Sequence, residues 1–309
     1  MSLDEVRALG RKLSNWRRWG ADDERGTLNF ITPEVVKRAA GLVRRGQVFS
    51  LGLSFGAEGP QIGQGGRVNP LHLMTAVDQK LPAEYPDTFR YADDVMVFPL
   101  QCATQWDSLA HVHYDGQLYN GFPAATTTSA GAARNGIDKV GAGIVSRGVL
   151  LDLARSARVP RLAPGHAISP AELEAAERAQ RVRVERGDVL LVRTGHLSVF
   201  TVDGDRTGYM RMMPGLGIAC AEWLHAREVA AVAADTNSVE VIPFEDPQTP
   251  LPLHLVCLRD MGLTLGEMFN LDALAEDCAA DGVWEFLFSA PPLKITGGVG
   301  SPLNPLAIK

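Results

Sequence analysis

Residues 187–195 read GDVLLVRTG, and the short apolar run in this stretch is bounded by glycine and charged residues. The stretch RGVLLDLAR at 147–155 has the same character. Runs of this length and composition are typical of buried strands. Both stretches are therefore predicted to be strands in the interior of the protein.

Between these two stretches, residues 169–184 read SPAELEAAERAQRVRV and predict a helix. Ser169 is the expected N-cap, Pro170 suits the first helical position, and Glu172 completes a capping box. Strands and helices mixed in this way along the chain predict an α/β fold.

The rest of the chain continues this mixture. Apolar residues three or four apart predict an N-terminal helix, and Thr32 followed by Pro33 predicts the start of a second one. The expected helices cover 3–19 and 33–45, the expected strands 46–55, 94–102 and 227–241 with one more near the C-terminal end, and a long loop 56–70. No repeat or linker divides the chain. We therefore expect one α/β domain over 46–309 with an N-terminal helical arm over 1–45.

Composition narrows the class of protein. The 309 residues are 46% hydrophobic and 21% charged with a net charge of −6, and no run of basic residues exceeds two. Nucleic acid is therefore not an expected partner. No apolar stretch approaches the roughly 20 residues of a membrane helix, so no membrane association is expected. The four cysteines form no C-x-x-C pair. Reduced thiols and a cytoplasmic location are the expectation.

Polar clusters follow three of the predicted strands, at 101–111, 193–196 and 235–240. Ligands of open α/β sheets bind at the carboxyl ends of strands. The first cluster lies within QCATQWDSLAHVHYDG, residues 101–116. A turn through Thr104 would bring Gln101 near Gln105, and Gln105 and Asp107 alternate on one extended face. Asp107 and His111, four apart, would share a face of a short helix.

A second polar pair lies in HLVCLRDMGLTLGE, residues 254–267. His254 and Glu267 are polar side chains in an otherwise apolar stretch. Together with Asp107 they would offer one nitrogen and two carboxylates, which suits a divalent metal ion.

Several neighbouring residues are candidates for binding substrate. Trp106 and Tyr119 flank the motif and would form either an aromatic wall for a planar substrate or part of the core. Thr104 lies inside the motif, and His72 follows the long loop, where it has either a pocket role or a structural one. The glycine-rich GQGGRV at 63–68 is not a phosphate-binding loop, and no Gly-x-Ser-x-Gly nucleophile elbow occurs.

Taken together, these motifs resemble the cyclase family of metal-dependent hydrolases, which includes bacterial kynurenine formamidase and isatin hydrolase. The family signature is His-x-Gly-Thr-His-x-Asp-x-Pro-x-His, and Thr104, Asp107 and His111 match it in register. Other similar segments follow in the expected order: GDVLLVRTG, PGLG at 214–217, ADTNSVE at 234–240, and His254 to Glu267 followed by NLDAL.

The resemblance implies a compact domain with a swivelling β/β/α core that assembles as a homodimer or homotetramer. It implies one divalent ion, manganese or zinc, on Asp107, His254 and Glu267, with His111 as the general acid/base. Two ligand histidines of the family are Gln101 and Gln105 here. An amide oxygen suits a hard cation better than zinc. Three outcomes stay open: a metal on the three ligands alone, a harder metal that also uses a glutamine oxygen, or a metal-free pocket.

The predicted function is that of a hydrolase acting on a small molecule. It would open an amide, a lactone or a cyclic imide or imine by metal-activated water, with His111 carrying the proton. Gln101 and Gln105 would orient polar groups and steady the oxyanion. Two alternatives remain: a metal-independent hydrolase or cyclase (a lyase or isomerase) using His111 and the glutamines, and a ligand-binding pseudoenzyme with a decayed metal site.

Overall fold

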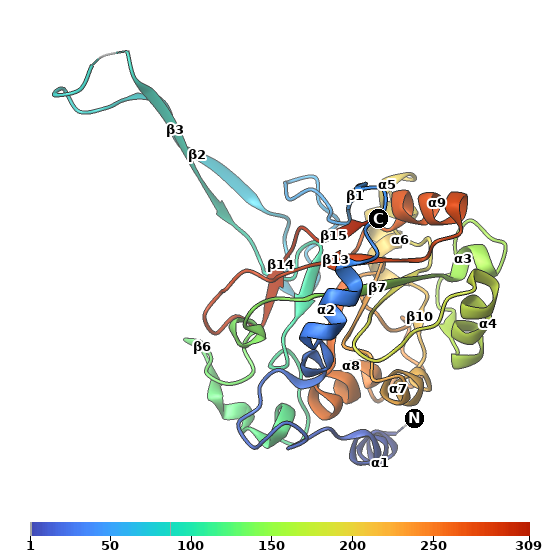
Figure 1. Ribbon diagram of the computed structural model, residues 1–309. Coiled ribbons are helices and arrows are strands. Elements are labelled where there is room, and N and C mark those ends of the chain that lie inside the picture. The colour runs from blue at the N-terminus through green and yellow to red at the C-terminus, as the bar shows by residue number, and fades with distance from the viewer. Residues whose placement is uncertain (1, 87) are drawn as a thin grey trace.

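A nine-stranded mixed sheet runs through the centre of the molecule (Figure 1). The computed structural model describes residues 2–86 and 88–309. Four central strands, β7, β9, β11 and β12, are parallel, and the strands outside them on both sides run antiparallel. In sheet order the strands are β1 (Val48–Ser50), β15 (Leu306–Ile308), β13 (Glu285–Ser289), β7 (Val145–Asp152), β9 (Val189–Arg193), β11 (Ala231–Ala234), β12 (Thr264–Glu267), β4 (Gln105–Asp107) and β14 (Gly300–Pro302).

Both faces of the sheet are buried, which explains the unbroken apolar runs of its central strands. Alternate residues of β9 enter two different cores: Leu190 and Val192 join one cluster, and Val189 and Leu191 join the other. Side chains from α1, α4 and α7 lie in the first cluster, and side chains from α9 lie in the second. The helices are α1 (Leu3–Leu13), α2 (Pro33–Ala40), α3 (Leu153–Ser156), α4 (Pro170–Gln180), α5 (Ser198–Thr201), α6 (Arg206–Arg211), α7 (Cys220–Ala226), α8 (Pro252–His254), a π-helix (Leu255–Met261) and α9 (Asp272–Asp281).

A separate hairpin, β2 (Leu71–Lys80) with β3 (Arg90–Val97), projects away from this body (Figure 1). Two short two-stranded pairs complete the strands: β8 (Ala167–Ile168) with β10 (Gly215–Leu216), and β5 (Thr127–Thr128) with β6 (Gly131–Ala132). Among the helices of the described residues, none is long and apolar enough to cross a membrane.

The α/β fold is confirmed, and so are its central elements. The stretches at 147–155 and 187–195 contain β7 and β9. The predicted helix after Ser169 is α4, and its capping box forms as expected, with the Ser169 backbone N–H donating to Glu172 Oε2 over 2.8 Å. The long loop over 56–70 is confirmed apart from one short 3₁₀ turn at Gln64–Gly66.

Other elements are shorter than predicted. The N-terminal helices end at Leu13 and Ala40, because Ser14 is already extended and Gly41 closes the second helix. The strand expected over 46–55 is only β1, and the one over 227–241 is only β11. The strand predicted over 94–102 does not run into the motif. It is β3, which ends at Val97 and belongs to the projecting hairpin. The closing segment contains β14 and β15, which were not predicted.

The N-terminal segment is hydrogen-bonded to the body. The backbone N–H of Asn15 donates to Asp260 O over 3.0 Å, Trp16 Nε1 donates to Arg259 O over 2.8 Å, and the Thr27 N–H donates to Gly262 O over 2.9 Å. The division of the chain at residue 45 stays a prediction.

Candidate metal centre

The ends of two neighbouring strands bring carboxylates together. Asp107 is the last residue of β4 and Glu267 the last of β12, and the two strands pair antiparallel with Gln105 directly opposite Glu267. Side chains of directly opposite residues lie on the same face, and so do residues two apart along a strand. Gln105, Asp107 and Glu267 therefore share one face of the sheet, as the alternation of Gln105 and Asp107 predicted.

His254 joins them from the short helix α8. Its Nε2 lies 3.4 Å from Glu267 Oε1 and 3.9 Å from Asp107 Oδ2. One donor atom each from Asp107, His254 and Glu267 lies within 4.8 Å of the others. All three residues are buried. The structure thus brings together the three ligands predicted from sequence.

Glu240 holds the imidazole of His254 in place. Its Oε1 pairs with His254 Nδ1, and the same carboxylate accepts the backbone N–H groups of His254 over 2.9 Å and of Leu253 over 3.2 Å. A carboxylate on one imidazole nitrogen is a common support for metal-ligating histidines, because it fixes the ring and leaves the other nitrogen to the metal. Sequence reasoning missed this residue; the only signal was an acidic residue in ADTNSVE after a buried strand.

Burial and charge shift the acid–base behaviour of this group. Burial, together with the nearby negative charge of Asp107, raises the pKa of Glu267 to about 7. Burial by itself lowers the pKa of His254, but its hydrogen bonds to Glu240 and Glu267 outweigh that effect and raise it to about 10. The site therefore retains protons that are lost from exposed residues of the same types, which is the behaviour expected of a buried anionic cluster.

The donor set fits a divalent cation. Asp107 Oδ2 is buried and has no hydrogen-bond partner among the described residues, and it faces His254 Nε2. Two carboxylates and one imidazole are ligands that manganese and zinc both accept. Buried carboxylates this close together are costly unless a positive charge or hydrogen bonds compensate them.

Gln105 supplies part of that compensation. Its amide Nε2 donates to Glu267 Oε2 over 2.7 Å and to Asp107 Oδ1 over 3.4 Å. Its Oε1 is buried and has no partner within the described chain. The amide of Gln105 therefore lies at the edge of the three-ligand cluster, where one of the family's ligand histidines is expected.

His111 lies beside the cluster, but not through the geometry predicted. The expected short helix is absent: His111 N–H donates to Ser108 O over 3.0 Å, which closes a turn after β4. The turn leaves His111 Nε2 3.8 Å from Asp107 Oδ1, and 19% of the side chain exposed. The charge of Asp107 raises the pKa of His111, but burial and the positive charges of His254 and Arg67 outweigh it, so the pKa lies below the usual value.

The exposed side of His111 opens into a cleft of about 450 Å³. Most of its lining is apolar. The apolar side chains come from the N-terminal helix, the turn after His111, the residues just before α8 and the start of the π-helix: Leu3, Val112, Pro250, Leu251 and Leu255.

Gln101 lies over the edge of β4 and β14. A Cβ atom at Gly300 would come within 2.6 Å of Gln101 Nε2, so a larger residue there would displace this amide. Gln101 Nε2 is buried and has no hydrogen-bond partner in the described part of the chain. Buried amides are normally hydrogen-bonded, so this unsatisfied N–H group is a candidate donor to a bound ligand.

The long loop contributes a positively charged side chain, Arg67, that sequence reasoning missed. Gln61 and Asn69 close the loop, since the Gln61 N–H donates to Asn69 Oδ1 over 2.9 Å and Asn69 Nδ2 returns to Gln61 O over 3.2 Å. Gln61 Nε2 also donates to Cys102 O over 2.9 Å, which fixes the loop against the motif. Arg67 lies within this closed loop, and its positive charge reaches both His111 and Glu267. Only the loop's length hinted at a functional role.

Trp106, Tyr119 and His72 lie outside the cluster. Trp106 points to the opposite face of the sheet, is fully buried, donates from Nε1 to Ala290 O over 2.9 Å and packs on aromatic rings of the core. Tyr119 is also fully buried, and its hydroxyl donates to Asp23 over 3.0 Å. His72 lies on the hairpin, with Nε2 2.7 Å from Asp94 Oδ2.

Thr104 is next to the cluster but is engaged in holding the backbone. Its hydroxyl donates to Met268 O over 2.6 Å and accepts the Leu53 N–H over 2.8 Å. It therefore ties the segment before β4 to the residue that follows Glu267.

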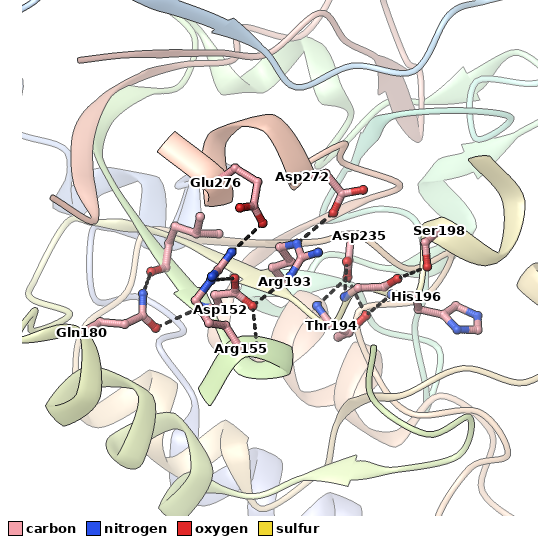
Figure 2. Close-up of polar contacts among 12 residues, drawn as sticks. Asp152, Arg155, Gln180, Arg193, Thr194, His196, Ser198, Asp235, Asp272 and Glu276 are labelled. Carbon is pink, nitrogen blue, oxygen red and sulfur yellow. Dashed lines mark hydrogen bonds and ion pairs between the residues drawn. The ribbon is translucent and has the colours of Figure 1, made fainter. Parts of the chain in front are cut away.

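Thr194 and Asp235, directly after β9 and β11, contact each other instead of the cluster (Figure 2). The Asp235 carboxylate accepts the Thr194 N–H over 2.9 Å, the Thr194 hydroxyl over 2.6 Å and the Gly195 N–H over 2.7 Å. Arg193 joins Asp152 over 3.0 Å and Asp272 over 2.8 Å (Figure 2). These contacts join the carboxyl ends of β7, β9 and β11 and pair the charges, so we assign them a structural role.

The fold and the site define a mixed α/β protein with a buried carboxylate–imidazole centre. The sequence profile of the family described as "Putative cyclase" matches residues 49–241. A crystal structure described as a novel cyclase is 40% identical, covers 97% of this chain and 99% of its own, and superposes with a TM-score of 0.88. This chain belongs to the cyclase family.

More distant structures share the fold. Isatin hydrolase A from Ralstonia solanacearum is 21% identical, with 90% of this chain and 99% of that chain covered and a TM-score of 0.66. Isatin hydrolase A from Labrenzia aggregata is 18% identical, with 87% and 94% covered and a TM-score of 0.62. The search of curated proteins gave no match.

Proposed function

We propose that this protein is a metal-dependent hydrolase that opens a small amide, lactone or cyclic imide or imine. The observation that carries the proposal is the convergence of Asp107, His254 and Glu267 on one buried point. Membership of the cyclase family and the hydrolase names of its structural relatives support it.

One divalent ion, manganese or zinc, would be held by Asp107 Oδ2, His254 Nε2 and a Glu267 oxygen. When bound, such an ion lowers the pKa of a water molecule and polarises a carbonyl group. Glu240 keeps the His254 ring aimed at this point. The sheet keeps the two carboxylates in place, since each ends a paired strand.

His111 is the proposed general acid/base. Its lowered pKa leaves the imidazole neutral near pH 7, so it can accept a proton from the attacking water. The protonated imidazole can then give that proton to the leaving nitrogen or oxygen atom of the substrate. His111 lies beside Asp107 on one side and lines the cleft on the other. It therefore stands between the polar cluster and solvent.

The two glutamines and Arg67 supply positive polarity around the substrate. The unsatisfied Gln101 Nε2 is a donor for the oxyanion that forms as the carbonyl is attacked. Gln105 holds both ligand carboxylates by its amide nitrogen. Turning that amide about its last bond would aim Oε1 at the ion instead.

The apolar lining of the cleft beside His111 favours a substrate with an apolar portion next to the scissile bond. This small molecule is the expected partner of the site.

A second candidate is a metal-free pocket, either catalytic through His111 or only ligand-binding. One observation favours it: the Gln105 amide already bridges Asp107 and Glu267, and so takes over part of the role of a cation.

The test measures formation of the carboxylic acid product by liquid chromatography, because opening an amide, a lactone or a cyclic imide yields a carboxylic acid. Protein loaded with Mn²⁺ or Zn²⁺ is assayed on a panel of these three classes, beside protein stripped by a chelator. Turnover that is lost on stripping and falls about 100-fold or more in His111→Ala is expected. His225→Ala, on α7, is the matched control and should retain turnover.

Two other results separate the candidates. Turnover that is unchanged after complete stripping would favour the metal-free enzyme. No acid release by the loaded protein on any class, with substrate binding intact, would favour the binding protein.

A further inference from the structure

Arg67 is a half-buried cation whose guanidinium group has no partner. Within residues 2–86 and 88–309 this group forms no ion pair and no hydrogen bond. Two other arginines withdrawn from solvent are paired: Arg147 with Asp188 over 2.7 Å, and Arg193 with Asp152 over 3.0 Å. A charge taken out of water is costly unless it is paired. Arg67 is therefore available to a ligand of opposite charge.

The loop that carries Arg67 has a defined shape. Its two ends are joined to each other and to the motif by the contacts of Gln61 described above. The turn before Arg67 uses left-handed backbone, which glycine adopts without strain, at Gly63, Gly65 and Gly66 with φ of 85°, 61° and 77°. The Arg67 N–H then donates to Gln64 O over 3.1 Å. The position of Arg67 is thus set by the backbone of a closed loop.

The guanidinium charge is directed over the candidate site. It acts on three ionisable groups that lie before β4, after β4 and at the end of β12: Cys102, His111 and Glu267. Solvent screens charges that point away into water. A charge that acts on groups from three segments of the site therefore lies over that site.

Arg67 is not the counter-ion of the carboxylate cluster. In the part of the chain that the structure describes, it forms no ion pair with Asp107 or Glu267, although Asp107 Oδ2 has no partner. Gln105 and His254 contact these carboxylates instead. One divalent ion balances two carboxylates, so the charge of Arg67 is left for the substrate.

We propose that Arg67 binds a carboxylate that the substrate carries in addition to its scissile bond, so that the preferred substrate is a small anion. A guanidinium group donates two parallel N–H groups to one carboxylate, which fixes both its place and its direction. Gln101 Nε2 remains the donor for the carbonyl under attack, and the apolar cleft beside His111 takes the rest of the molecule. The inference rests on the proposed hydrolase function and adds the charge of its substrate.

The first test compares matched substrates of the metal-loaded protein. In each class that is turned over, a compound bearing a carboxylate is paired with the same compound bearing a primary amide. Arg67→Gln should raise the KM of the acid about 10- to 100-fold, the effect of losing a charged hydrogen-bonded pair, and leave the KM of the amide unchanged. Arg67→Lys keeps the charge without the fork and should recover part of the loss.

The second test needs neither turnover nor metal. Phenylacetate, a carboxylate with an apolar ring, and neutral phenylacetamide are titrated into protein stripped by a chelator, with binding followed by ligand-observed NMR. Phenylacetate should bind Arg67→Gln at least about 10-fold more weakly than wild type, and phenylacetamide should not distinguish the two. Arg44→Gln, at an exposed arginine outside the cluster, is the control and should match wild type in both tests. The unfolding midpoint of each variant checks the fold.

The outcomes separate this inference from the hydrolase proposal. It is overturned if Arg67→Gln raises the KM of acid and amide alike, or if phenylacetate binds wild type no more tightly than Arg67→Gln. Failure of the hydrolase proposal gives another pattern: no substrate is turned over, while phenylacetate binding still depends on Arg67.

Discussion

Gln105 lies directly across the sheet from Glu267, and its amide nitrogen donates to the Glu267 carboxylate over 2.7 Å. A side chain that donates to two ligand carboxylates competes with a cation for the same oxygens. The affinity of the site for metal should therefore depend on this glutamine.

Gln105→His should strengthen metal binding about 10-fold or more. The substitution removes the competing amide N–H and adds an imidazole, which binds zinc better than an amide oxygen does. Competition with a chromogenic chelator measures the dissociation constant. Gln47→His, at an exposed glutamine outside the cluster, is the control and should leave the constant unchanged. Equal affinities for Gln105→His and wild type would mean that the amide does not compete.

Glu240→Gln should weaken metal binding about 10- to 100-fold, the effect typical of removing the carboxylate behind a ligating histidine. The amide has the shape of the carboxylate, so the backbone contacts to Leu253 and His254 can partly remain. The same chelator assay measures it, with the unfolding midpoint as a check on the fold. Unchanged affinity would show that Glu240 supports the helix start and not the ligand.

Metal binding should release protons near neutral pH. The pKa of Glu267 is raised to about 7 by burial and by Asp107, and that of His254 to about 10 by its carboxylate partners against the effect of burial. A raised pKa means that the proton is still bound at pH 6.5, and a cation must displace it. Affinity should therefore rise with pH. Calorimetry at pH 6.5 in buffers of different ionisation enthalpy counts the protons; a count of zero would contradict the shifts.

Trp106→Ala should destabilise the protein by about 3–5 kcal/mol, the usual cost of deleting a buried aromatic side chain. The indole is fully buried against Phe269 and Phe288. Urea unfolding measures the free energy. A loss below about 1 kcal/mol would contradict a core role for this indole.

Local patterns predicted the centre of the fold well. The apolar runs of β7 and β9 identify strands because both sheet faces are covered, and the capping box of α4 is made within four residues. The same signal was ambiguous at 94–97. The exposed valines and methionine of this hairpin strand look, in sequence, like those of a buried strand.

The candidate site was predictable only in part. Gln105 and Asp107 follow from strand alternation, whereas the meeting of Asp107 with His254 and Glu267 depends on β4 pairing with β12. Trp106 lies between two site residues on a strand, so it faces the other side of the sheet. Its role was ambiguous because alternation alone does not say whether that side is core or pocket. Glu240 and Arg67 reach the site through loops, where side-chain direction has no sequence period.

Metal content of the protein purified without chelator and incubated with Mn²⁺ or Zn²⁺ tests the central claim most directly. After removal of loosely bound ions, elemental analysis should give one ion per chain for the wild type and for the control Asp94→Ala, and none for Asp107→Ala. Asp107 carries the unsatisfied buried oxygen, whereas Asp94 is exposed on the hairpin. A wild type that retains no more metal than Asp107→Ala would contradict the metal centre.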